Sequence, residues 1–137
     1  MGNRAVVQTV ALIFGVIYFL VGVLGFIGPL IGTSSFITIT QDRHALLGLA
    51  DINLLHNLVH LAIGLAGLAA ASSVANSRTF CQVVGVILLI IGLLGVFVGN
   101  LFGILPLAGF DIPLHLVTGA VLAYFGFAAT ISVRSRA

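Results

Sequence analysis

The sequence predicts an all-α protein, a four-helix transmembrane bundle built from two tandem helical hairpins. Hydrophobic residues make up 61% of the 137 residues and charged residues only 6%, and the mean hydropathy is +1.32. A soluble domain carries roughly a quarter charged residues, so lipid rather than water is expected to surround this chain. Long apolar runs and motifs that recur in both halves of the sequence support the same fold class.

Polar segments divide the apolar sequence into four predicted spans. About twenty apolar residues cross a bilayer as a helix. The predicted spans cover about residues 5–31, 52–73, 79–104 and 112–133, and a predicted outer loop covers about residues 32–51. The first run is too long for the apolar core of a signal peptide and no A-x-A cleavage site follows it, so we expect a span there. Residues 1–137 are thus expected to form a single integral membrane domain.

The arginines are unevenly distributed between the two sides of this predicted topology. Arg4, Arg78, Arg134 and Arg136 fall on one side, and Arg43 falls on the other. The positive-inside rule therefore predicts a multi-pass protein of a bacterial inner membrane with both termini in the cytoplasm. The acidic residues then lie on the outer side; they are Asp42, Asp51 and Asp111.

Glycines recur with the same spacing in the first and third spans, and a His-x-x-x-Gly motif recurs in the second and fourth. Small residues allow helix backbones to approach closely in lipid, so these glycines are predicted to line helix–helix contacts. The predicted packing glycines are Gly15, Gly22, Gly85, Gly92 and Gly99. The recurrence predicts an internal repeat with a pseudo-twofold axis along the membrane normal.

Polar residues form one stripe on the second span and another on the fourth. At about 100° per residue, Asn53, His56, Asn57 and His60 share a face of the second helix. The fourth helix presents a matching stripe of Asp111, His115 and Thr118. Polar groups in hydrocarbon are costly and usually face the bundle interior. We therefore expect an inward-facing His/Asn/Asp cluster near the outer side, with His60 opposite His115.

Three interpretations of this cluster remain open from the sequence. In the first, its side chains bond to one another and fix the helix register, with Asn53, Asn57 and Thr118 as structural members. In the second, the cluster binds a divalent metal or a tetrapyrrole such as haem or chlorophyll. The metal ligands would come from His56, His60, His115, Asp51 and Asp111, and the tetrapyrrole ligands from His60 and His115. In the third, an oligomer uses the histidines in a proton or small-solute pathway.

Several functional classes are disfavoured by what the sequence lacks. Cys81 is the single cysteine, so an internal disulfide and a CxxC redox motif are excluded. No paired glutamates, phosphate-binding loop or recognisable nucleophile motif is present, so an enzyme is not expected. The basic balance comes from arginines that set topology, and no nucleic-acid partner is expected. His44 is interpreted as a solvated loop residue, and Tyr18 and Tyr124 as packing residues whose hydroxyls find a local partner.

Two blocks of sequence carry a family resemblance that covers most of the chain. The segments LLGLADINLLHNLVHLAIGLAGL and DIPLHLVTGAVLAYFG contain the patterns LHNxVHLxxGxxGL and DxxLHLxxG. The chain thereby resembles the bacterial four-helix membrane proteins of the domain of unknown function DUF4383. The matching positions are His56, Asn57, His60, Gly64, Gly67, Asp111, His115 and Gly119. The resemblance implies an integral membrane protein, and it implies no activity, cofactor or substrate.

The function expected from the sequence is that of a small non-catalytic integral membrane protein. Its expected surroundings are the lipid bilayer, together with a larger membrane complex in which it would be an accessory subunit, or further copies of itself. The polar cluster would organise the bundle or hold a ligand.

Overall fold

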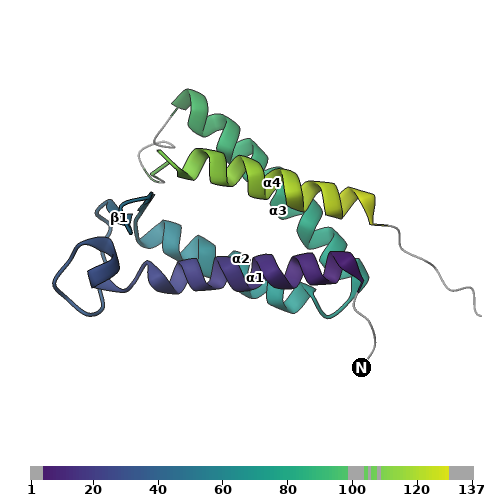
Figure 1. The fold of residues 1–137 in the computed structure, drawn as a ribbon, viewed down its shortest axis with the longest axis horizontal. Coiled ribbons are helices and arrows are strands. Elements are labelled where there is room, and N and C mark those ends of the chain that lie inside the picture. Colours follow the sequence, from purple (N-terminus) through teal and green to yellow (C-terminus); the bar gives the residue numbers. More distant parts are fainter. Residues whose placement is uncertain (1–4, 99–103, 105, 108, 130–137) are drawn as a thin grey trace, which may run out of the picture.

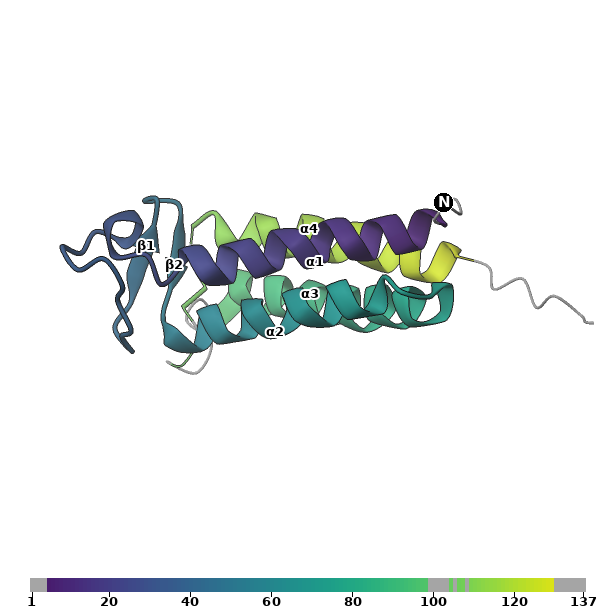
Figure 2. The ribbon, with the colours of Figure 1, turned by 90° about the horizontal axis from the view of Figure 1, so that it is seen from below.

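The computed structural model describes residues 5–98, 104, 106–107 and 109–129. Four α-helices run side by side along the long axis, and a small outer segment lies at one end of them (Figures 1 and 2). The elements in chain order are α1 (Val6–Leu24), a short 3-10 helix η1 (Gly28–Ile31), β1 (His44–Leu46), β2 (Ala50–Ile52), α2 (Leu54–Ala70), α3 (Val74–Val98) and α4 (Asp111–Ala128). The predicted all-α, four-helix fold class is confirmed.

Three of the helices, α1, α3 and α4, are long and apolar enough to cross a membrane, while α2 is apolar but shorter, with 17 residues. The outer surfaces of the helices carry large apolar side chains. Leu20 of α1 is 50% exposed, Ile90 of α3 is 53% exposed and Val117 of α4 is 62% exposed. Soluble proteins rarely expose such continuous apolar surface, whereas a bilayer solvates it well. This chain is a membrane protein.

Helix α1 ends at Leu24, well before the predicted end of the first span at residue 31. The backbone then turns, Ile27 pairs with Ile37 as an isolated bridge, and Pro29 lies in the first turn of η1. Proline has no N–H to donate to the carbonyl of Gly25, four residues earlier, and its ring would clash with that carbonyl, so a continuous α-helix cannot run through residue 29. The predicted first span is therefore a helix followed by a separate 3-10 turn.

The other helix boundaries follow the predicted spans more closely. Helix α3 begins at Val74, earlier than the predicted residue 79, and its described part ends at Val98. Helix α4 begins at Asp111 and ends at Ala128. The predicted ends of these spans at residues 104 and 133 involve positions outside the described residues, as do Arg4, Arg134 and Arg136.

The outer segment, for which the sequence predicts a loop, contains a β-hairpin. Strands β1 and β2 pair antiparallel, with His44 opposite Ile52 and Leu46 opposite Ala50. The turn between them uses Leu47 and Gly48, both with positive φ, of 52° and 71°. Two consecutive positive φ values suit the right-handed twist of a two-stranded hairpin, although leucine rarely adopts one.

The hairpin is attached to both halves of the bundle. Leu46 and Ile52 are buried together with Ile31 of η1 in a small apolar cluster. On the other side, Ala50 forms an isolated antiparallel bridge with Gly109, shortly before α4 begins. The outer segment therefore covers the end of the bundle at which α2 and α4 begin.

Helix α1 packs mainly against α2, and α3 packs mainly against α4. Glycines make these contacts possible. A Cβ atom at Gly15 would lie 2.7 Å from the backbone nitrogen of Leu68, and one at Gly85 would press on the backbone of Ala123. Larger residues at these positions would force the paired helices apart.

Two further glycines of the predicted set lie at the same kind of contact. A Cβ atom at Gly22 would meet Leu61, and one at Gly92 would meet Leu116, each at 2.8 Å from the side chain. Gly99 lies outside the described residues.

Contacts between the two helix pairs are concentrated in an apolar core. Ala11, Cys81 and Leu122 are fully buried there, and Leu88 and Phe80 are nearly so. The ends of α1 and α4 that carry the chain termini lie together at the opposite end of the molecule from β1 and β2 (Figure 1). The helix pairs diverge toward the hairpin, and this is where the polar cluster lies.

We expect Gly85→Leu to lower the midpoint of thermal unfolding in detergent by several degrees, because the added side chain meets the backbone of Ala123. Overpacking of this kind typically costs about 1–3 kcal/mol. Ala120→Leu is the matched control, since Ala120 is exposed on α4 and faces away from the contact. Equal stability of the two variants would show that α3 and α4 do not pack as described.

Candidate functional site

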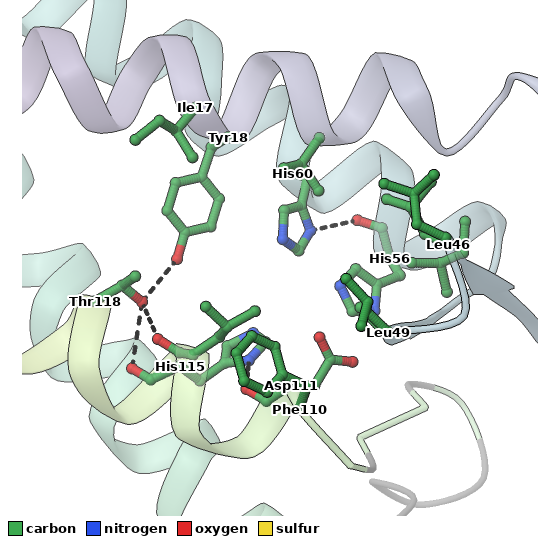
Figure 3. A pocket seen from close by; sticks show the side chains of 15 residues that line it. Ile17, Tyr18, Leu46, Leu49, His56, His60, Phe110, Asp111, His115 and Thr118 are labelled. Carbon is green, nitrogen blue, oxygen red and sulfur yellow. Dashed lines mark hydrogen bonds between the residues drawn. The ribbon is translucent and has the colours of Figure 1, made fainter. Parts of the chain in front are cut away.

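A pocket of about 230 Å³ lies between α1, α2 and α4, beneath the β-hairpin (Figure 3). Its polar lining comes from three helices, and its apolar lining comes from α1, α4 and the hairpin. The polar lining residues are Tyr18, His56, His60, Asp111, His115 and Thr118. The pocket therefore brings together three of the four histidines with one of the three acidic residues.

His60 and His115 have the same local arrangement on different helices. The Nδ1 atom of His60 lies 3.0 Å from the carbonyl oxygen of His56, and that of His115 lies 2.7 Å from the carbonyl oxygen of Asp111. A carbonyl oxygen can only accept, so Nδ1 is the donor in both rings. Each neutral ring then keeps a lone pair on Nε2, available to an external donor or a metal.

The three imidazoles lie within contact or near-contact distance of one another. The rings of His56 and His60 are stacked with centroids 4.4 Å apart, and Tyr18 stacks on the other side of His60 at 5.0 Å. The ring of His115 lies edge-on to them, 6.2 Å from His56 and 6.4 Å from His60. The ring of His60, on α2, therefore lies near the ring of His115, on α4.

Tyr18 and Thr118 connect α1 to α4 at the inner side of the pocket. The hydroxyl oxygens of the two residues are 3.2 Å apart, and the Thr118 hydroxyl also lies 2.6 Å from the carbonyl oxygen of Leu114. Because Thr118 donates its proton to that carbonyl, the Tyr18 hydroxyl donates to Thr118. The sequence predicts Tyr18 as a packing residue whose hydroxyl finds a local partner, and that partner is Thr118, on another helix.

Two polar atoms of this site are buried and have no hydrogen-bond partner among the residues that the structure describes. They are Nδ1 of His56 and Oδ2 of Asp111, on side chains only 2% and 3% exposed. Leaving a buried polar atom unpaired costs about 1–3 kcal/mol, and more for a charged group. Such atoms in a polar, hollow site mark places where a further molecule can bond.

The asparagines of the predicted cluster lie outside the pocket lining. Asn53 caps α2 by accepting from the His56 N–H at 2.9 Å, and its amide donates to the Ile104 carbonyl at 2.9 Å. Asn57 donates to the carbonyl oxygen of Gly25 at 2.9 Å, where α1 ends. These two side chains hold helix ends in position.

Asp51, the remaining predicted metal ligand, is used elsewhere in the structure. Asp51 forms an ion pair with Arg43 at 2.8 Å within the hairpin, and neither Asp51 nor His44 lines the pocket. Across the described residues, no group of three or more His, Cys, Asp or Glu side chains has an arrangement that could hold a metal ion. The pocket volume is also below the 300–1,000 Å³ typical of drug-sized ligands, so a tetrapyrrole would require the helix pairs to separate further.

Comparison with known proteins gives one match. The model of the family described as "Domain of unknown function (DUF4383)" matches residues 8–128, a range that contains every residue of the pocket. No curated protein and no solved structure matches the chain.

We expect Asn57→Ala to destabilise the protein by about 1–3 kcal/mol, because it leaves the buried Gly25 carbonyl without its donor. Thermal unfolding in detergent measures the loss. Asn76→Ala is the control, since Asn76 is exposed near the start of α3. If Asn57→Ala unfolds at the wild-type temperature, Asn57 does not hold the end of α1.

Proposed function

This chain belongs to the DUF4383 family, and we propose that it is a non-catalytic integral membrane protein that binds a small ligand in the His/Asp pocket. The observation that carries the proposal is the arrangement of His60 and His115. Both rings are fixed through Nδ1 to their own helices, which leaves Nε2 free. An imidazole that binds a ligand is commonly oriented in this way by a bond from its other nitrogen to a backbone carbonyl.

A purely structural role explains the histidines less well. The imidazoles of His60 and His115 bond to carbonyls of their own helices, so these two bonds do not join one helix to another. Among the described pocket residues, the side-chain bond that joins α1 to α4 is that of Tyr18 with Thr118. A cluster retained for register would be expected to pair its polar groups across the interface, whereas Asp111 Oδ2 and His56 Nδ1 have no partner.

The non-catalytic part of the proposal rests on how the pocket hydroxyls are used. The Thr118 proton goes to the Leu114 carbonyl, and the Tyr18 proton goes to Thr118. Neither hydroxyl is paired with an imidazole that could activate it as a nucleophile. A binding module of this type suits an accessory subunit of a larger membrane complex, and that role is part of our proposal.

We further propose that all four helices span a bacterial inner membrane, with both termini in the cytoplasm and the pocket toward the outer face. The 17 residues of α2 are at the short end of the range for a spanning helix. Arg78, near the start of α3, and Arg43, in the hairpin, lie at opposite ends of the bundle. The distribution of arginines supports this orientation.

An internal two-hairpin repeat is also part of the proposal, and matched contacts support it. Gly22 meets Leu61 in the first helix pair as Gly92 meets Leu116 in the second. His60 and His115, each four residues before a glycine, make the same bond to their own helix. A repeat would explain why His60 of the first helix pair and His115 of the second line the same pocket.

The test of ligand binding is to extract the protein gently in native lipid and to identify bound small molecules by native mass spectrometry. We expect a bound species in the wild type that is lost in His60→Asn and His115→Asn, because asparagine offers no equivalent of Nε2. His44→Asn is the control, since His44 does not line the pocket. An absorption spectrum and metal analysis of the same sample identify a tetrapyrrole or a metal directly.

Retention of the bound species in both pocket variants would exclude these two histidines as its ligands. A well-folded wild-type protein that carries nothing in native lipid would contradict the proposed binding function.

The orientation has its own test, which is cysteine labelling in intact cells with a membrane-impermeant reagent. We expect Ser35→Cys to be labelled and Asn76→Cys to be protected, since the two positions are exposed at opposite ends of the bundle. The native Cys81 is fully buried and should contribute little background. The reverse labelling pattern would place the pocket on the cytoplasmic side.

A further inference from the structure

We propose that the pocket selects an amphiphile with a primary ammonium head group, whose hydrocarbon chain extends into the bilayer between α1 and α4. This inference rests on the proposed binding function and specifies the chemistry of the ligand. It follows from the polar atoms that the pocket offers, from its charge and from its apolar edge.

The pocket offers three hydrogen-bond acceptors for which the described residues provide no donor. Nε2 of His60 and Nε2 of His115 keep their lone pairs, because each ring donates through Nδ1. Oδ2 of Asp111 is a third acceptor, buried and without a partner. Figure 3 shows His60 on α2 facing His115 and Asp111 on α4 across one space. A primary ammonium group carries three N–H donors, one for each of these acceptors.

The charge of the pocket favours the same class of ligand. No arginine lines it, and the sequence contains no lysine. Arg43, in the neighbouring hairpin, is paired with Asp51. An Asp111 carboxylate therefore has no cationic side chain beside it, and a buried charge requires a counter-charge. An anionic head group, such as a carboxylate or a phosphate, would meet these three acceptors and no cationic side chain among the described lining residues.

The rim of the pocket is apolar on the side that faces lipid. Ile17 of α1 is 46% exposed and Leu114 of α4 is 41% exposed, and both line the pocket. Leu47 and Leu49 of the hairpin turn, also lining residues, are 60% and 61% exposed. Helices α1 and α4 pack much less closely than the helices within each pair. A hydrocarbon chain can lie in this gap, against the apolar rim.

The size of the pocket fits a head group and a short length of chain. A volume of 230 Å³ is that of roughly eight water molecules in the liquid. The remainder of a long alkyl chain would extend past Ile17 and Leu114 into the bilayer.

Thermal unfolding of the full-length protein in a neutral detergent tests this inference, with a thiol-reactive fluorogenic maleimide as the probe. Cys81 is the single cysteine and is fully buried, so it reacts only when the bundle opens. The ligands are dodecylamine, dodecyltrimethylammonium, dodecanol and dodecanoate. They share one chain length and differ in charge and in N–H or O–H donors.

We expect dodecylamine alone to raise the unfolding midpoint of the wild type, by about 5 °C at saturation. Asp111→Asn keeps the size of the side chain and removes its charge, and it should weaken dodecylamine binding on the order of 10- to 100-fold. Asp42→Asn is the matched control and should bind as the wild type does, since Asp42 is exposed and does not line the pocket. The comparison of the four ligands on the wild type tests the ammonium assignment even if Asp111→Asn fails to fold.

Stabilisation by dodecyltrimethylammonium equal to that by dodecylamine would overturn the proposed N–H recognition. Stabilisation by dodecanol or dodecanoate instead, lost in His60→Asn, would overturn the ammonium assignment and leave the binding function standing. If none of the four compounds stabilises the wild type and native mass spectrometry finds no bound molecule, both the ligand class and the binding function are wrong.

Discussion

Close backbone contact within each helix pair is the constraint on which the rest of this structure depends. In lipid, apolar side chains gain nothing by leaving their surroundings for a neighbouring helix, so association relies on dense packing. Gly15 and Gly85 provide it, because each lets its helix rest directly on the backbone of the next one. The two tight pairs then meet through a limited apolar core, and their divergence toward the hairpin creates the pocket.

Much of this arrangement could be predicted from periodicity. The stripe that carries His56 and His60 on one helix and His115 on another can only be inward-facing in lipid, and the rings do meet. Periodicity does not show which bonds the individual polar side chains make. Asn53 and Asn57 share the histidine face, yet each bonds to a nearby carbonyl at a helix end. Which side chains bond to a helix end depends on where the neighbouring helix ends, and the spacing of polar residues along one helix does not show this.

The outer segment was harder to predict for a local reason. Its strands have three residues each, and the turn between them places a leucine, Leu47, at positive φ beside Gly48. Neither feature resembles the alternating strands and Asn-Gly turns that indicate a hairpin. The hairpin is held by tertiary contacts, through Leu46 and Ile52 on η1 and through the bridge of Ala50 with Gly109. The early end of α1 at Leu24 was also hard to predict, because the chain already turns away from the helix before it reaches Pro29.

The bond between Tyr18 and Thr118 has a consequence for the electrostatic potential inside the pocket. Its protons run in one direction, from the phenol to the threonine and from the threonine to the backbone of α4. The imidazole protons on Nδ1 likewise point back into their own helices. In the rings of His60 and His115 the negative end of the imidazole dipole, at Nε2, therefore lies on the side away from the carbonyl of its own helix. A polar molecule bound at these two rings would therefore be oriented with its positive end toward them, even with every side chain neutral.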